Sequence, residues 1–160
     1  MTDWKTWKPK ILATLMFIID EASGEVLLIR KKRGLGAGKI NGPGGKIDPG
    51  ETSEQCAIRE TQEELGVTAI APVKHGELWF QFVDGLSLHV DVFVATQHEG
   101  TAIETPEAIP LWTKLNELPF DQMWADDRFW LHEVLVERKH FIGRFDFDDD
   151  TMLTSEMEWL

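Results

Sequence analysis

The chain has 160 residues, 28 of them acidic and 16 basic, so its formal net charge is −12 at neutral pH. This excess of negative charge argues against binding to nucleic acid or to an anionic membrane surface. A hydrophobic content of 42% excludes a disordered chain and suffices for one domain, residues 1–160, with a real core. The single cysteine, Cys56, excludes an internal disulfide, and we expect a cytoplasmic, monomeric protein.

The first expected elements are two paired strands. Three lysines precede an apolar run, Ile11–Ile19, which could be read as a weak signal peptide. The run is far too short to span a membrane, and no small-x-small cleavage site follows it. We therefore expect a β-strand there, pairing with Glu25–Arg30 across the turn at residues 21–24.

A glycine-rich segment, Gly34–Lys46, follows the basic strand end Lys31–Arg33. Its glycines would let the backbone approach phosphate groups closely, although a flexible loop beside a solvated basic patch is the plainer interpretation. A helix is expected over Ser53–Leu65, because Thr52 and Gln55 form a capping box and Gly66 supplies a stop signal.

Three glutamates occupy a narrow arc of this helix: Glu60, Glu63 and Glu64. A fourth, Glu51, lies in the turn before the helix. Like charges at this spacing cost roughly 0.2–0.5 kcal/mol per pair. A divalent cation with a preference for oxygen ligands, such as Mg²⁺, would offset that cost, and a solvated acidic face is the alternative. Arg59 precedes Glu63 by one i+4 step and can orient it.

The opposite side of the helix should pack against a sheet through Ile58, Thr61 and Leu65, with Ala57 flanking. Cys56 is interpreted as packing, because no basic group is placed to activate its thiol.

Further elements follow from alternating or helical apolar patterns. Strands are expected at Gly76–Val83 and Leu86–Thr96 around an Asp84–Gly85 turn, at Leu111–Leu115, and in a closing hairpin, Phe141–Phe147 with Thr151–Trp159; a helix is expected at Arg128–Lys139. The fold class is therefore α/β (α+β), a mixed sheet between helices. The five histidines show no zinc-ligand spacing, and Trp4, Trp7 and Trp159 have no assigned role.

The residues from Gly45 to Val67 resemble the Nudix box, which they match at Gly45, Glu51, Arg59, Glu60, Glu63, Glu64, Gly66 and Val67. Thr61 stands where an aliphatic residue is usual; it is nearly isosteric with valine and can bond back to the carbonyl four residues earlier. The resemblance implies a Nudix fold, a mixed β-sheet sandwiched between α-helices. It also implies hydrolysis of a diphosphate linkage with Mg²⁺, or Mn²⁺ as an alternative ion.

Two further blocks resemble the branch of Nudix hydrolases known as oxidised purine nucleoside triphosphatases, or 8-oxo-dGTP diphosphatases. The blocks are Lys31–Thr52 and Pro119–Asp127, the latter followed by a helix and Phe141–Phe145. The resemblance implies that 8-oxo-dGTP or 2-oxo-dATP is cleaved to the monophosphate and pyrophosphate, which sanitises the nucleotide pool.

The resemblance also assigns residues to roles. The catalytic group would be Glu60, Glu63 and Glu64, oriented by Arg59. The metal ligands would be the Gly44 carbonyl and the side chains of Glu60, Glu63, Glu64 and Glu107. The base would be held by Asn41, Asp126 and Asp127 at its edge and by Trp124 on its face. Other substrate contacts would come from Thr14, Lys31, Leu35, Gly44, Gly45, Lys46, Phe80 and Leu88. Leu35 and Leu88 replace a Phe and a Met of the best-known members.

The pair Asp126–Asp127 has two interpretations. One of the two could cap the following helix. Alternatively, both face one apolar pocket, where they would not both ionise, and exchanging the proton between them would let one pocket read oxidised guanine and oxidised adenine.

Two other functions stay open at this point. The chain could be a Nudix hydrolase of another substrate, such as a methylated purine nucleotide, ADP-ribose or a capped RNA. It could also be a non-catalytic nucleotide sensor, although the complete set of glutamates argues against that.

Overall fold

The computed structural model describes residues 1–160 and contains eleven strands, two α-helices and two short 3-10 helices. The strands are β1 Ile11–Asp20, β2 Glu25–Lys31, β3 Ile40–Asn41, β4 Gly44–Lys46, β5 Thr68–Ile70, β6 Val73–Phe82, β7 Ser87–Ala95, β8 Gln97–Glu99, β9 Ala108–Lys114, β10 Phe141–Asp148 and β11 Thr151–Trp159. The helices are α1 Ser53–Leu65, η1 Phe120–Gln122, η2 Asp127–Phe129 and α2 Leu131–Glu137. Neither α-helix has the length and apolar character that crossing a bilayer requires.

Nine strands form one mixed sheet in the order β11-β10-β6-β7-β1-β2-β3, with β4 added beside β1 and β9 beside β2. The pairs β1–β7 and β6–β10 are parallel, and the other pairs are antiparallel. The strand β1 pairs with β2 only over Ile18–Asp20, and over Ala13–Leu15 it pairs with β4 instead. Because β1 and β2 separate there, the glycine-rich segment enters the sheet between them.

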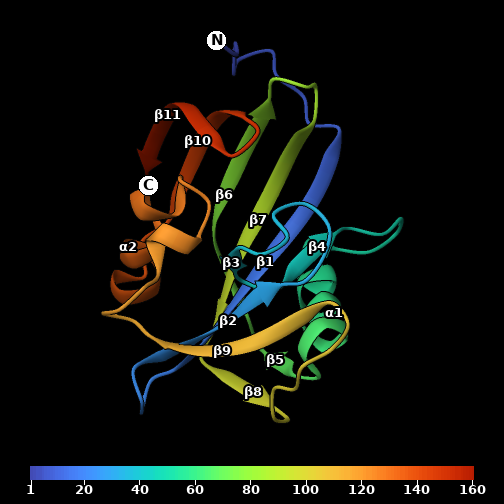
Figure 1. The fold of residues 1–160 in the computed structure, drawn as a ribbon, viewed down its shortest axis with the longest axis vertical. Helices are drawn as coiled ribbons and strands as arrows, with labels where there is room; N and C mark the ends of the chain where they lie inside the picture. Colours follow the sequence, from blue (N-terminus) through green and yellow to red (C-terminus); the bar gives the residue numbers. More distant parts are fainter.

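The two helices lie on opposite sides of the sheet (Figure 1). On one side, Leu131, Val134 and Leu135 of α2 join the larger core with Phe17 and Phe141. On the other side, a smaller core buries α1 against β1, β2 and β7; its members include Ala57, Leu65, Met16, Ile18, Leu27 and Phe93. The expectation of a mixed sheet between helices is thus confirmed.

The helix α1 has the expected ends. The Thr52 side chain accepts a hydrogen bond from the Gln55 N–H, the Gln55 side chain accepts one from the Thr52 N–H, and Gly66 adopts the left-handed conformation with φ 73°. Thr61 is buried, and its hydroxyl donates to the Ala57 carbonyl at 2.8 Å, so the hydroxyl of this Nudix-box departure is satisfied within the helix.

The helix expected over Arg128–Lys139 is shorter in the structure. The chain forms η2 over Asp127–Phe129 and begins α2 only at Leu131. The cause is Trp130, whose φ of −141° breaks the helical path so that its indole can stack on Phe141 in the core. The capping interpretation of Asp126 and Asp127 is wrong, because neither η2 nor α2 receives a side-chain cap.

Replacing Thr52 by alanine should lower the free energy of unfolding by about 1 kcal/mol, because the Gln55 N–H at the start of α1 loses its acceptor. Urea unfolding followed by circular dichroism measures the change. Ser53→Ala, one residue later and outside the capping box, is the matched control. An equal loss in both variants would contradict a specific capping role.

Candidate active site

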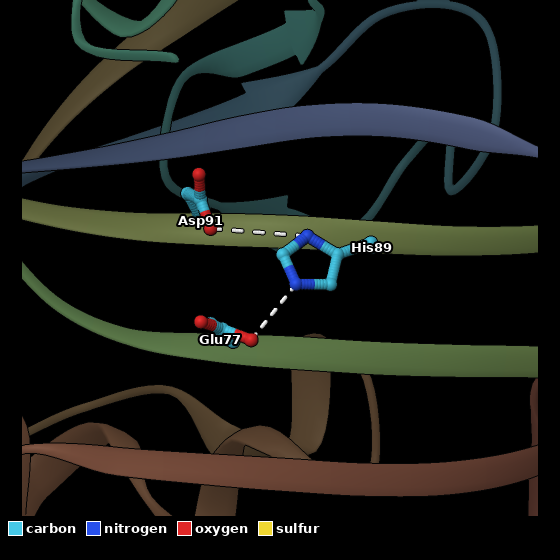
Figure 2. Close-up of side chains that lie close together, drawn as sticks. All are labelled: Glu77, His89 and Asp91. Carbon is cyan, nitrogen blue, oxygen red and sulfur yellow. Dashed lines mark hydrogen bonds and ion pairs between the residues drawn. The ribbon is translucent and has the colours of Figure 1, made fainter. Parts of the chain in front are cut away.

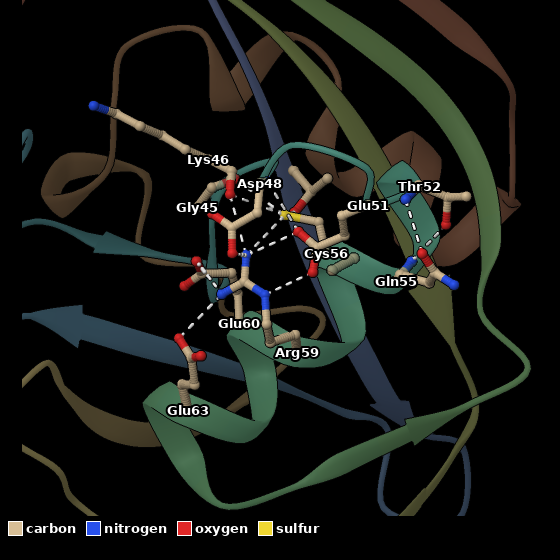
Figure 3. A network of polar contacts seen from close by, with 12 residues as sticks. Gly45, Lys46, Asp48, Glu51, Thr52, Gln55, Cys56, Arg59, Glu60 and Glu63 are labelled. Atoms are coloured by element: carbon tan, nitrogen blue, oxygen red, sulfur yellow. Dashed lines mark hydrogen bonds and ion pairs between the residues drawn. The ribbon is translucent and has the colours of Figure 1, made fainter.

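The acidic face of α1 is organised around one guanidinium. Arg59 donates to Glu51 at 2.6 and 2.9 Å, to Glu60 at 3.0 Å and to Glu63 at 3.2 Å, and it lies 3.3 Å from the Asp48 carboxylate (Figure 3). The hydrogen bond from Arg59 is the main reason that the pKa of Glu51 falls to about 2. The predicted orientation of Glu63 by Arg59 is confirmed. One positive charge shared among four carboxylates leaves the cluster anionic.

Glu64 stands apart from this network and is buried. Burial raises its pKa to about 7, against the opposing effect of the Gly44 N–H, which donates to Glu64 at 2.9 Å. Burial also raises the pKa of Glu60, against the opposing hydrogen bond and charge of Arg59. The charge of Glu60 raises the pKa of Glu64 further, so the two carboxylates interact with each other.

The backbone of β4 packs closely against β1 on one side and against the Glu60 carboxylate on the other. A Cβ on Gly44 would lie 1.9 Å from the Thr14 carbonyl oxygen, and one on Gly45 would lie 2.6 to 2.8 Å from the Glu60 carboxylate. Only glycine fits at position 44, where the obstacle is backbone, whereas a side chain at position 45 would displace the Glu60 carboxylate. The backbone at Gly44 and Gly45 is therefore the surface that a phosphate or metal ion near Glu60 would meet.

A cavity of about 510 Å³ opens beside these residues and extends along the α2 side of the sheet. Most of the predicted site residues line it: Thr14, Lys31, Leu35, Asn41, Gly44, Gly45, Lys46, Glu60, Glu64, Phe80, Leu88, Glu107, Trp124, Asp126 and Asp127. Residues as far apart in the chain as Thr14 and Asp127 thus meet in one space, which is polar at the Glu60 end and also contains the two aspartates.

Two predicted residues do not line the cavity: Arg59 and Glu63. The Glu63 side chain is 56% exposed and reaches Arg59. Glu107 lines the cavity, but its carboxylate forms an ion pair with Arg33, which lowers the pKa of Glu107. Sequence reasoning did not find this partner, because the two residues meet only where β9 pairs with β2.

At the other end of the cavity, Asp126 and Asp127 are both buried, with 0% and 4% of their surfaces exposed. Asp126 accepts a hydrogen bond from the Trp130 indole at 3.0 Å, but Asp126 Oδ1 and Asp127 Oδ2 are buried without any partner. Burial raises the pKa of both residues, and the charge of Asp126 raises that of Asp127 further. The pair therefore retains a proton, and both residues line the cavity.

Trp124 forms an aromatic wall with two phenylalanines that the sequence did not assign to the site. Its ring meets Phe82 and Phe147 edge to face at 5.9 and 5.6 Å. The Lys39 ammonium lies over the same indole, 5.1 Å from the ring centre. Alternation along β6 was the available signal for Phe82, since it shares its face with the predicted Phe80.

Cys56 is buried, as expected, and its thiol contacts Thr14 at 3.3 Å. Arg59 Nη2 lies 3.8 Å from the sulfur, a contact that the sequence did not predict. Burial outweighs this contact and raises the pKa of the thiol, so the packing role holds.

The sequence from residue 9 to residue 134 matches the model of the NUDIX domain, which is more than half of the chain. The chain belongs to the NUDIX family. It is 44% identical over 137 residues to the oxidized purine nucleoside triphosphate hydrolase of Danio rerio, covering 85% of this chain and 86% of that protein. The mouse protein of the same name is 41% identical over 145 residues, covering 89% and 91%.

Solved structures agree with this assignment. The crystal structure of the mutator MutT protein from Bacillus halodurans superposes with a TM-score of 0.82 at 28% sequence identity, covering 92% of this chain and 97% of that one. The NUDIX helix, the preceding glycine turn and the sheet are therefore arranged as in known members.

NUDIX hydrolases generally use a divalent metal ion. The oxygen donors of Glu60 and Glu64, desolvated and turned toward the cavity, suit a hard divalent cation. The chain also brings His89 together with Glu77 and Asp91 on neighbouring strands, with ligand atoms within 4.8 Å of one another (Figure 2). These carboxylates already have protein partners, since Glu77 accepts from Trp79 and His89, and Lys74 lies 3.1 Å from both acids.

The raised pKa of Glu64 gives the metal-free protein a pH-dependent stability. Because the folded-state pKa of about 7 exceeds the ordinary value of 4.5, the folded state binds the proton more tightly. Stability should therefore fall as pH rises from 4.5 to about 7 and level off above that. Glu64→Gln has no carboxyl group to lose this proton. Between pH 4.5 and about 7, its free energy of unfolding should therefore rise relative to that of the original chain by on the order of 2 kcal/mol.

Urea unfolding in chelator at several pH values measures this difference. Glu21→Gln, in an exposed turn, controls for the removal of a carboxylate elsewhere. A gap between Glu64→Gln and the original chain that does not change with pH would contradict the burial argument.

Proposed function

We propose that this NUDIX hydrolase cleaves oxidised purine nucleoside triphosphates, such as 8-oxo-dGTP and 2-oxo-dATP, to the monophosphate and pyrophosphate, and so sanitises the nucleotide pool. The observation that carries the proposal is one cavity with a carboxylate site at one end and a buried, unsatisfied aspartate pair beside an indole at the other. The two relatives named oxidized purine nucleoside triphosphate hydrolases support it.

In this proposal the triphosphate lies at the polar end of the cavity, against the backbone of Gly44 and Gly45 and near Lys31 and Lys46. Glu60, Glu64 and the Gly44 carbonyl would hold Mg²⁺, with Glu63 and Glu107 as further ligands. Mn²⁺ is an alternative ion for the same oxygen donors. When bound, the ion neutralises phosphate charge and activates water.

The proton of the attacking water goes to Glu64. Of the three NUDIX glutamates, Glu63 does not line the cavity and is tied to Arg59, and Glu60 is also bonded to Arg59. Glu64 lines the cavity, and its hydrogen-bond partner is the Gly44 N–H and not a basic side chain, so its carboxylate is the one placed to accept the proton. Water oxygen then bonds to phosphorus as the α–β anhydride linkage breaks, and pyrophosphate leaves.

The purine lies at the other end, stacked on Trp124 with Phe80, Leu88 and Leu35 around it. Asn41 and the aspartate pair contact its edge. Because the pair shares a proton, it offers one donor and several acceptors, and moving the proton reverses which aspartate donates. That exchange would allow one pocket to accept either an oxidised guanine or an oxidised adenine.

The decisive measurement is pyrophosphate release with Mg²⁺ from a panel of 8-oxo-dGTP, 2-oxo-dATP, O6-methyl-dGTP and unmodified dNTPs, compared by kcat/KM. The oxidised purines should rank first. Glu64→Gln should lower kcat by about 10²- to 10⁴-fold while the protein stays folded, because the proton acceptor is lost.

Glu21→Gln is the matched control and should retain full turnover, since it lies outside the cavity. Near-normal turnover in Glu64→Gln would overturn its role. A ranking led by O6-methyl-dGTP would point to a methylated purine as the substrate. No turnover of any nucleotide, with binding retained, would favour a sensor.

The aspartate pair yields a separate prediction. Asp126→Asn and Asp127→Asn each fix one residue as a neutral amide, so the proton can no longer move between the two. Each variant should change the ratio of kcat/KM for 8-oxo-dGTP to that for 2-oxo-dATP by about tenfold, the effect of one hydrogen bond to a base edge. Unchanged ratios among 8-oxo-dGTP, 2-oxo-dATP and dGTP in both variants would rule out proton exchange as the basis of base reading.

A further inference from the structure

Residues 2–10, called here the N-terminal strap, lie against the sheet on the side opposite the cavity. Trp7 stacks on Trp79 of β6 with ring centres 5.4 Å apart and planes 14° apart, and its indole N–H donates to the Gln81 side chain at 2.9 Å. Trp4 meets both rings, at 5.3 and 6.2 Å. The dark blue segment can be followed beside the upper ends of β6 and β7 in Figure 1.

Two further contacts anchor the strap at its ends. The Thr2 hydroxyl donates to Asp146 of β10, a carboxylate that is only 6% exposed and also accepts from Thr154. The Lys10 N–H donates to the buried Ser87 hydroxyl at the start of β7, at 2.9 Å. The strap thus bonds to the three adjacent strands β10, β6 and β7.

In β6 and β10, the residues that contact the strap alternate along the strand with residues that line the cavity or pack against its lining. Trp79 and Gln81 bracket Phe80, and Gln81 directly precedes Phe82; both phenylalanines line the cavity. On β10, Asp146 lies between Phe145 and Phe147, which pack on Phe80 and Phe82. Successive side chains of a strand point to opposite faces, so the strap and the cavity share the same stretches of backbone.

Helix α1 does not support this part of the sheet. The smaller core beneath α1 contains no residue of β6 or β10. On that side, Trp79 is covered instead by Trp7, Trp4 and the Arg144 guanidinium, which lies 4.4 Å from the Trp79 ring centre. Without the strap, the Trp79 ring would lose the cover of Trp4 and Trp7. The face of β6 opposite the cavity would then be more exposed.

We propose that the N-terminal strap positions the cavity wall formed by Phe80 and Phe82, against which Phe147 packs, and thereby sets the affinity for the purine without taking part in hydrolysis. This inference rests on the proposed function, because it takes that wall for the surface beside the base. Trp7 is a positioning residue, acting through Trp79 and Gln81 on the side chains that face the substrate.

The test compares kcat and KM separately for the panel nucleotide that the original chain hydrolyses best. Trp7→Ala should raise KM about fivefold and leave kcat within about twofold, since one aromatic stack is lost far from the glutamates. Trp7→Phe keeps the stack and loses only the hydrogen bond to Gln81, so it should recover most of the affinity. Trp112→Ala removes a tryptophan of β9 that does not line the cavity, and it should leave KM unchanged.

Amide hydrogen exchange on the ligand-free proteins provides a readout that needs no substrate. In Trp7→Ala the amides of β6 and β10 should lose protection while those of α1 keep it.

Unchanged KM or unchanged protection of β6 and β10 would overturn the role of the strap. If the original chain fails to hydrolyse any oxidised purine, the proposed function falls, and hydrogen exchange alone then decides whether the strap holds the wall. If Trp7→Ala does not fold, Trp7→Phe and Gln81→Met carry the same comparison with smaller changes.

Discussion

The change of partner along β1 is the constraint on which the rest of the site depends. Where β1 leaves β2 and takes up β4, a glycine backbone comes within contact of Thr14 on one side and of Glu60 on the other. The same separation exposes the alternate residues of β1 to the cavity. A side chain at Gly44 would force β4 out of the sheet and remove the N–H that holds Glu64. The glutamate end and the aspartate end of the cavity thus depend on one backbone arrangement.

Burial of carboxylic acids at both ends of the cavity has two different outcomes. At the α1 end, Glu60 and Glu64 are desolvated and close to each other, an arrangement that a cation would relieve. At the other end, no basic side chain is hydrogen-bonded to Asp126 or Asp127, and the pair keeps a proton instead. Carboxylic acids at both ends of the cavity thus have raised pKa values because of burial, but only at the α1 end does one of them, Glu60, lie beside a basic side chain, Arg59.

The sequence alone predicts those parts of the fold and site that are determined by interactions between residues close together in the chain. The ends of α1 follow from Thr52 and Gly66, and the glutamate arc follows from helical spacing. It was insufficient where partners are distant: the ion pair of Glu107 with Arg33 depends on strand pairing, and the break at Trp130 depends on a stack with Phe141. The base-pocket residues were predicted by family resemblance, since no local pattern relates Asn41 to the distant aspartate pair.

The strap also has a consequence for the order in which the molecule forms. Its anchors are far away in sequence: Trp7 bonds to a residue 74 positions later, and Thr2 to one 144 positions later. During synthesis the strap therefore emerges well before its last partner, β10. The strap is thus ordered only after β10 has been synthesised, and a tag fused ahead of Thr2 would sit directly beside the buried Asp146 that Thr2 contacts.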